Sequence, residues 1–227
     1  MEPMYIMATK NGDSVDIQGG TLDDMFDNAK AAFEKGDIEE SERLFNVVVA
    51  ESKDESTRGL ALVNLALIEV AKGDASAAQN MLVKAESALK GTEDLAQVKL
   101  VRMDLYSKSG DWKKVGAEAE GLLKKECRPG GGCRAEQRAQ AHLMAGRASQ
   151  FEGDLSLALR SYQSSIQVGF SEIPFQQHLK NKVLAAASFK AAEIYHHFYA
   201  QMHIILPEAR IHIDFPDKMA YMRKAKD

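Results

Sequence analysis

The stretch His142–Val168, HLMAGRASQFEGDLSLALRSYQSSIQV, decides how the rest of the chain is organised. Its spacing predicts two short amphipathic helices joined by a turn at Gly153-Asp154, because apolar residues recur at helical intervals on both sides of that turn. Alanine and glycine at facing positions are expected to let the two helices approach closely, with Tyr162 filling the space beside them. One such hairpin cannot bury its apolar face alone, so it needs further copies to stack against.

The same Gly-Asp pair recurs along the chain, at Gly36-Asp37, Gly73-Asp74, Gly110-Asp111 and Gly153-Asp154. Glycine supplies the positive φ that ends one helix, and aspartate caps the next helix. Five residues after each glycine stand Ser41, Ala78, Val115 and Ala158. Nine residues after each glycine stand Phe45, Leu82, Ala119 and Tyr162. Four matched hairpins are therefore expected.

These hairpins resemble tetratricopeptide repeats, a family of paired antiparallel helices of about 34 residues. The resemblance covers roughly residues 22–168. No repeat has the tryptophan near its start, and the proline that closes the second helix is missing, so no particular subfamily is indicated. The resemblance implies an all-α fold, an α-α superhelix (a solenoid) of about four helical hairpins plus a long C-terminal capping helix.

The expected organisation has four parts. They are a flexible leader at 1–20, repeats at 21–169 (about 21–56, 57–91, 92–133 and 134–169), a capping helix or helices at 170–206, and an irregular tail at 207–227. Thr21 and Asp24 form a capping-box pattern, so the first helix is expected to begin there and to end at Lys35. An extended stretch is expected near Tyr5 and Ile6.

The capping segment follows Pro174 and is too long for one repeat helix, so one break or kink is expected in it. Its apolar residues recur at helical spacing and predict a face that covers the last repeat: Leu179, Val183, Ala186, Phe189, Ala192 or Ile194, Phe198 and Met202. The tail carries an alternating apolar run and then Pro216, after which a short helix is expected.

The composition is that of an ordinary water-soluble protein, with 45% hydrophobic and 27% charged residues and a net charge of -4. Mild acidity gives no reason to expect nucleic acid or an anionic membrane as a partner. No apolar run is long enough for a membrane span, and the start lacks the pattern of a secretory signal. Two cysteines do not make a disulfide framework, so a reducing cytoplasmic location is expected.

The resemblance implies a partner-binding groove lined by the first helix of each pair. Exposed inner positions are expected at Phe26, Leu100 and Met144 and at the predicted partner-binding residues, which are Lys30, Phe33, Val63, Asn64, Leu67, Val101, Asp104, Leu143 and Arg147. Family members that grip a carboxyl-terminal peptide use lysines, asparagines and an arginine here, and only Asn64 matches that set. An apolar or helical segment fits the groove better. Alternatively, these residues pack on one another or on the capping helix.

Other polar clusters carry weaker signals. Cys127 and Cys133 flank three glycines in an exposed, non-helical loop, where two unpaired cysteines or a reversible disulfide are the alternatives. His196 and His203 are seven residues apart, about 10 Å along a helix, which is too far to share an ion. No metal site, cofactor site or catalytic motif is predicted.

The predicted function is a non-enzymatic scaffold for protein–protein interaction: an adaptor, a complex subunit or a chaperone-like holder. Its partner is expected to be another protein or a peptide segment. Two alternatives stay open. The first is a regulatory module that responds to metal or redox state through the histidine-rich helix or the Cys127–Cys133 loop. The second is a structural protein that self-associates as a homo-oligomer.

Overall fold

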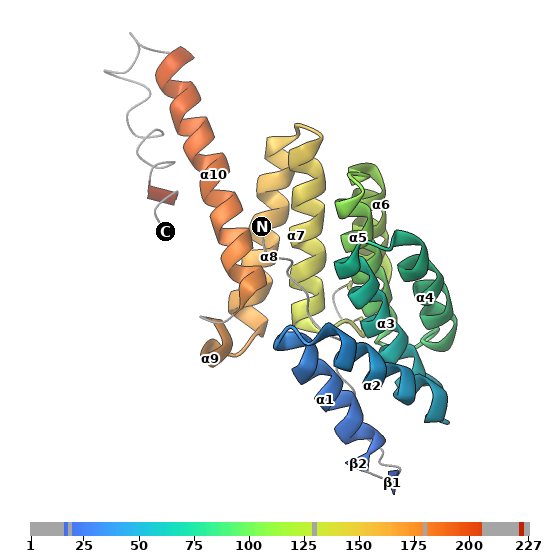
Figure 1. Cartoon of the computed structure of the whole chain (residues 1–227). Coiled ribbons are helices and arrows are strands. Elements are labelled where there is room, and N and C mark those ends of the chain that lie inside the picture. Colours follow the sequence, from blue (N-terminus) through green and yellow to red (C-terminus); the bar gives the residue numbers. More distant parts are fainter. Residues whose placement is uncertain (1–15, 18–19, 129–130, 179–180, 206–222, 225–227) are drawn as a thin grey trace. The chain divides into compact units, whose positions relative to one another are not determined.

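The computed structural model describes residues 16–17, 20–128, 131–178, 181–205 and 223–224 (Figure 1). The elements follow in the order β1 (Asp16–Ile17), β2 (Gly20–Thr21), α1 (Leu22–Glu34), α2 (Ile38–Glu51), α3 (Glu55–Lys72), α4 (Ala75–Ala88), α5 (Leu95–Lys108), α6 (Trp112–Lys125), α7 (Ala135–Phe151), α8 (Leu155–Glu172), α9 (Phe175–His178) and α10 (Lys182–Ile205). The predicted all-α class is confirmed. The chain divides into two compact units, Met1–Gln137 and Arg138–Asp227.

The Gly-Asp turns form as the sequence predicts. Each glycine has a left-handed backbone, with φ of 85° at Gly36, 88° at Gly73, 76° at Gly110 and 88° at Gly153. Each following aspartate accepts a hydrogen bond from the backbone N–H three residues on, which caps the second helix of the pair. The same local chemistry therefore reverses the chain four times.

The matched positions after the turns are all fully buried, which confirms the predicted register. Relative exposure is 0% for Ser41, Ala78, Val115, Ala158, Phe45, Leu82, Ala119 and Tyr162. Small residues at the earlier position allow helices to approach, and larger residues at the later position fill the space between them. Ala119 is the exception, because it is a small residue at the later position.

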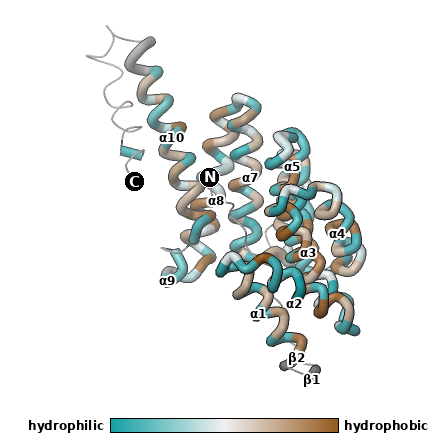
Figure 2. The backbone as a smooth tube through the Cα atoms, viewed as in Figure 1, coloured by the Kyte–Doolittle hydropathy of each residue, from teal (hydrophilic) through white to brown (hydrophobic). Residues whose placement is uncertain are grey.

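The helix pairs of the first unit pack against each other in chain order. Helix α1 contacts α2, α2 contacts α3, and α3 contacts both α4 and α5, which in turn contacts α6. Because α3 has neighbours on several sides, almost all of its middle is buried. The core includes an edge-to-face pair of rings, Phe26 and Phe45, with centroids 5.3 Å apart. Figure 2 shows hydrophobic and hydrophilic residues interleaved along these helices.

Ion pairs join neighbouring helices in the first unit, both within a hairpin and between hairpins. Arg102 on α5 donates to Glu86 of α4 at 2.5 Å and to Glu118 of α6 at 3.2 Å. Its side chain is only 11% exposed, so both contacts form in partly dehydrated surroundings. Lys72 of α3 likewise lies 2.7 Å from Glu42 of α2. These pairs fix how neighbouring hairpins are aligned.

The second unit contains most of α7, together with α8, α9 and α10. Gly146 on α7 faces Tyr162 on α8, and an added Cβ there would lie 2.5 Å from the ring carbon Cε1. Helix α10 packs along α8. The predicted break after Pro174 is confirmed, since α9 ends at His178 and α10 begins at Lys182. Asn181 caps α10 by accepting from the backbone N–H groups of Val183 and Leu184, both at 3.0 Å.

The ends of the chain are described only in part. A two-residue antiparallel pairing, β1 with β2, lies just before α1 and was not predicted. The predicted stretch near Tyr5 and Ile6, and the alternating run of the tail, lie outside the described residues. Arg223 and Lys224 are described as helical. Among the described helices, none is both long and apolar enough to cross a lipid bilayer.

The linker between α6 and α7 differs from the expectation. Cys127 and Cys133 are joined by a disulfide, and their relative exposures are 1% and 7%. Of the two alternatives for these cysteines, the structure shows the disulfide, and the expected exposure is wrong at both residues. The described residues of the linker are non-helical, as the sequence predicts, but ion pairs from Glu126 and Arg134 tie its two ends to the start of α5, and both cysteines are buried.

Candidate partner-binding site

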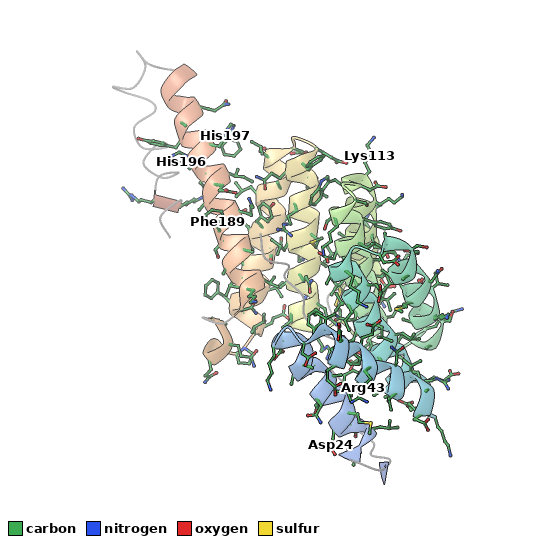
Figure 3. All side chains as sticks on the ribbon, in the orientation of Figure 1. Asp24, Arg43, Lys113, Phe189, His196 and His197 are labelled. Carbon is green, nitrogen blue, oxygen red and sulfur yellow. A yellow bond between two sulfur atoms is a disulfide. The ribbon has the colours of Figure 1, made fainter. Side chains whose placement is uncertain are left out.

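The second unit carries a pocket of about 800 Å³ beside α10. Residues of the α7–α8 turn region line one side of it, and residues of the middle of α10 line the other. The lining is Gln150, Leu155, Phe189, Lys190, Ala192, Glu193, Ile194, His196, His197 and Tyr199. Figure 3 labels three of these on α10: Phe189, His196 and His197. This volume is enough to hold several side chains of a partner.

The α7–α8 side of the pocket is held rigidly by Tyr162. Its hydroxyl donates to Oε1 of Gln150 at 2.7 Å, which orients the Gln150 amide at the edge of the pocket. Burial raises the pKa of the Tyr162 hydroxyl above its usual value, so the group stays neutral and remains a donor. Because Gly146 packs directly on this ring, the aromatic ring has no room to turn away.

The α10 side is positioned by a stripe of small and apolar residues. Ala187, Ala191 and Ile194 are buried, with exposures of 0%, 4% and 2%. An added Cβ at Gly169 of α8 would lie 2.9 Å from Leu184, so the two helices approach closely there. Outside this stripe, Phe189 is left 63% exposed.

Phe189 was expected in the buried face of the capping segment, and that expectation is wrong. Val183 and Ile194 are buried as predicted, but Leu184, Ala187 and Ala191 complete the buried face of α10 in place of Ala186 and Phe189. Alanines allow a closer approach to α8 than a phenylalanine would, so they face α8 and Phe189 faces water. Spacing alone could not choose between these two stripes. The alanine-rich sequence of α10 was the feature that could have identified the buried face.

The charges at the pocket are paired with each other. Nζ of Lys190 lies 2.6 Å from Oε2 of Glu193 and 5.7 Å from the centre of the Phe189 ring. A cation over a ring face contributes only about 0.5–1 kcal/mol at an exposed site. With its charges paired and its walls containing Leu155, Phe189 and Ile194, the pocket suits an apolar group better than an ion.

Large exposed apolar side chains concentrate on the second unit. Phe151 is 68% exposed, Leu157 43% and Phe170 60%, in addition to Phe189. In the described part of the first unit, the large apolar side chain that is exposed is that of Val83. Phe151 and Leu157 lie within a few residues of the pocket-lining residues Gln150 and Leu155 in sequence. Phe170 does not line the pocket, so Phe189 is the exposed aromatic ring among these residues that the pocket itself presents.

The partner-binding residues predicted on the first helices divide into two groups by burial. The expected exposure is wrong for the buried group, which is Val63, Asn64, Leu67, Val101 and Leu143, with exposures from 0% to 2%. Phe26, Leu100 and Met144 are also buried. The physical reason in α3 is that α2, α4 and α5 all pack against it. These residues therefore pack inside the fold and are not exposed on the surface of a groove.

The remaining predicted residues are partly exposed. They are Lys30, Phe33, Asp104 and Arg147. Lys30 lies 3.9 Å from Asp27 on its own helix, and the guanidinium of Arg147 lies 4.0 Å from the Met144 sulfur. Any contact of these four residues with a partner stays a prediction.

Two histidines of α10 have described side chains. His196 and His197 are exposed and line the pocket. The side chain of His203 lies outside the described residues. Within the part of the chain that the structure describes, no group of three histidine, cysteine or acidic residues is arranged to hold a metal ion.

Comparisons with known proteins bear on the fold. Residues 22–120 match the family model of the tetratricopeptide repeat-like domain, which confirms the resemblance inferred from the Gly-Asp spacing. A crystal structure of a tetratricopeptide repeat protein from Parabacteroides merdae ATCC 43184 is similar at 18% identity. That likeness covers 90% of this chain and 76% of the other, with a TM-score of 0.49, and carries no argument about function. The curated proteins give no match.

Proposed function

We propose that this chain, whose residues 22–120 match a tetratricopeptide repeat-like domain, is a non-enzymatic scaffold that binds another protein. We place the main contact at the pocket beside α10. The observation that carries this proposal is Phe189, a large aromatic residue that is 63% exposed and lines a pocket of about 800 Å³. A ring in that position loses contact with water when a partner covers it.

The pocket favours an apolar segment of the partner. Burying one large apolar side chain contributes about 1.5–3 kcal/mol, and the pocket walls supply Leu155 and Ile194 beside Phe189. Gln150, His196 and Tyr199 add polar groups that can bond to the backbone of the bound segment. The proposed occupant is therefore a short helical or extended segment with one or two large apolar side chains.

Rigidity of the site supports binding. Tyr162 fixes Gln150, and Gln163 donates to the Tyr195 hydroxyl at 2.5 Å, which links α8 to α10. Because these contacts hold the walls in place before a partner arrives, little conformational entropy is lost by the scaffold on binding. Most of the conformational entropy lost on binding is therefore lost by the partner segment.

Matched phenylalanine variants test the location of the site. Phe189→Ala removes the ring from the pocket, whereas Phe170→Ala removes a ring of similar exposure, 60%, that does not line it. Proteins captured from the source cell by the full chain are identified, and the affinity of the leading partner is then measured for each variant. We expect Phe189→Ala to weaken binding at least about tenfold, since about 1.4 kcal/mol is a factor of ten.

Phe170→Ala is expected to bind the partner as the unchanged chain does. Equal binding by Phe189→Ala and the unchanged chain would contradict the pocket as the contact site. In that outcome, Lys30→Glu and Asp104→Lys test the partly exposed residues that the sequence predicts for the groove. If the leading partner is a second copy of the chain, light scattering detects a dimer that Phe189→Ala converts to a monomer.

A further inference from the structure

The linker between α6 and α7 is closed by the disulfide between Cys127 and Cys133. The two Cα atoms lie 4.7 Å apart, within the range that a disulfide spans without moving the backbone. Both residues are buried. Six positions separate them in sequence, so the bond closes a very short loop.

Ion pairs and a hydrogen bond anchor both flanks of the disulfide to the beginning of α5. Glu126, just before Cys127, accepts from Lys99 at 2.7 Å. Arg134, just after Cys133, lies 3.1 Å from Asp94. Three residues further on, Gln137 donates to Gln97 at 3.4 Å, and both amides are buried. These contacts hold the two cysteine backbones beside each other independently of the bond.

The backbone of the loop is also shaped for this closure. The N–H of Cys127 donates to the carbonyl of Leu122 at 2.9 Å, a bond across five residues that closes the C-terminal end of α6. At Gly131 a Cβ would clash with the backbone oxygen of Glu126, so the loop folds back closely only with glycine there. The geometry brings the two sulfur atoms together and covers them.

We infer that Cys127 and Cys133 are oxidised in the working protein, and that the chain works in an oxidising compartment. This inference replaces the cytoplasmic location expected from the cysteine count, because persistent disulfides are rare where thiols are kept reduced. Burial of both sulfurs shields the bond from thiol reductants, so it is a structural bond rather than a reversible switch. The inference stands apart from the proposed pocket.

The bond forms by thiol–disulfide exchange before the linker is buried. One cysteine thiolate attacks the disulfide of a dithiol oxidoreductase and forms a mixed disulfide with it. The second cysteine thiolate then displaces the oxidoreductase, which leaves as a dithiol. The two thiols of the chain lose two protons and two electrons, and the oxidoreductase gains them.

Thiol trapping in the source cell tests the inference directly. Cells are lysed in acid, and the denatured chain is treated with a maleimide-linked polymer before and after reduction. We expect no modification before reduction and two modified cysteines after it. Two modified cysteines before reduction would overturn the inference, whatever the behaviour of the pocket variants.

A second measurement tests whether the bond is sheltered by the fold. The purified full chain is incubated with dithiothreitol in its native state and in denaturant. We expect slow reduction of the native protein and rapid reduction of the denatured protein. Lys99→Met, which removes one anchor but keeps both cysteines, is expected to accelerate native-state reduction. Equal rates for native and denatured protein would overturn the structural role.

Production in two compartments of a host completes the test. We expect the melting temperature of chain made in a reducing cytosol to lie about 4–8 °C below that of chain made in an oxidising compartment. The double variant Cys127→Ser with Cys133→Ser is the control and is expected to melt alike from both sources. Equal melting temperatures for the unchanged chain from both compartments would overturn the inference.

Discussion

The two units of the chain differ in where they place their phenylalanines. In the first unit, Phe26 and Phe45 are 1% and 0% exposed and stack edge to face inside the core. In the second unit, Phe151, Phe170 and Phe189 are each at least 60% exposed. Both units are built from the same kind of helical hairpin. The difference teaches that one repeat architecture provides stability in one unit and an exposed apolar surface in the other.

Removal of a buried ring should have the largest effect. Phe45→Ala is expected to lower the free energy of unfolding by about 3–5 kcal/mol, because it leaves a cavity beside Phe26 that the packed helices cannot close. Urea unfolding followed by circular dichroism measures this change. A loss below about 1 kcal/mol would show that the first unit is loosely packed and would remove the contrast between the units.

A matched pair of glycine variants tests the close approach of α7 and α8. Gly146→Ala places a methyl group against the Tyr162 ring and is expected to destabilise the protein by about 1–3 kcal/mol. Gly121→Ala, in α6, meets no neighbouring atom within 4 Å. It is expected to stabilise by about 0.5–1 kcal/mol through helix propensity.

Thermal melting of both glycine variants gives the comparison. If the melting temperature of Gly146→Ala equals or exceeds that of the unchanged protein, the contact between Gly146 and Tyr162 is not tight. That result would contradict the claim that Tyr162 holds one wall of the pocket rigidly.

Acid should weaken the second unit through His142 on α7. Burial, together with the nearby charge of Arg138, lowers the pKa of His142 below its usual value of 6.5. As the pH falls below 6.5, the unfolded chain binds a proton at this side chain before the folded chain does. This contribution to stability is therefore present above that pH and is lost as the pH falls through the folded-state pKa.

The variant His142→Gln isolates this effect from other titrating groups. Urea midpoints of the two proteins at pH 7 and pH 5 are compared. We expect the unchanged protein to lose more stability over this range than the variant does. An equal loss in both would show that His142 is accessible to protons in the folded state.

The smallest effect on stability is expected at the pocket. Phe189→Ala should change the free energy of unfolding by less than about 0.5 kcal/mol, because the ring is already mostly in water. The same urea measurement that detects the loss at Phe45 applies here. A loss above about 2 kcal/mol would mean that Phe189 is part of the core, and that reduced partner binding by this variant reflects unfolding.

The repeat architecture was predictable because its signals are local. A glycine with positive φ and an aspartate cap act within one turn of chain. The turns at Gly36-Asp37 and Gly153-Asp154 can therefore be predicted without knowing which helices pack around them. The small and large positions that follow each turn are likewise set by hairpin packing. The family match over residues 22–120 agrees with this.

The site and the disulfide depend on contacts between distant residues. Exposure of Val63 and Leu67 is decided by which helices surround α3, and spacing within one helix does not reveal that. The face that α10 turns toward α8 follows from the fit of Leu184 against Gly169. Pairing of Cys127 with Cys133 follows from anchors at Asp94 and Lys99, which lie about 30–40 residues earlier in the chain.

The repeated Gly-Asp junction has a consequence for how such a chain evolves. Helices that precede a junction differ in length, from 13 residues in α1 to 18 in α3, yet the helix that follows has 14 residues after the first three junctions and 18 after the fourth. Because every junction restarts the helix at its own cap, an inserted or deleted turn upstream is not transmitted to the next hairpin. The chain can thus change length by one hairpin segment while the fit of the others is inherited intact.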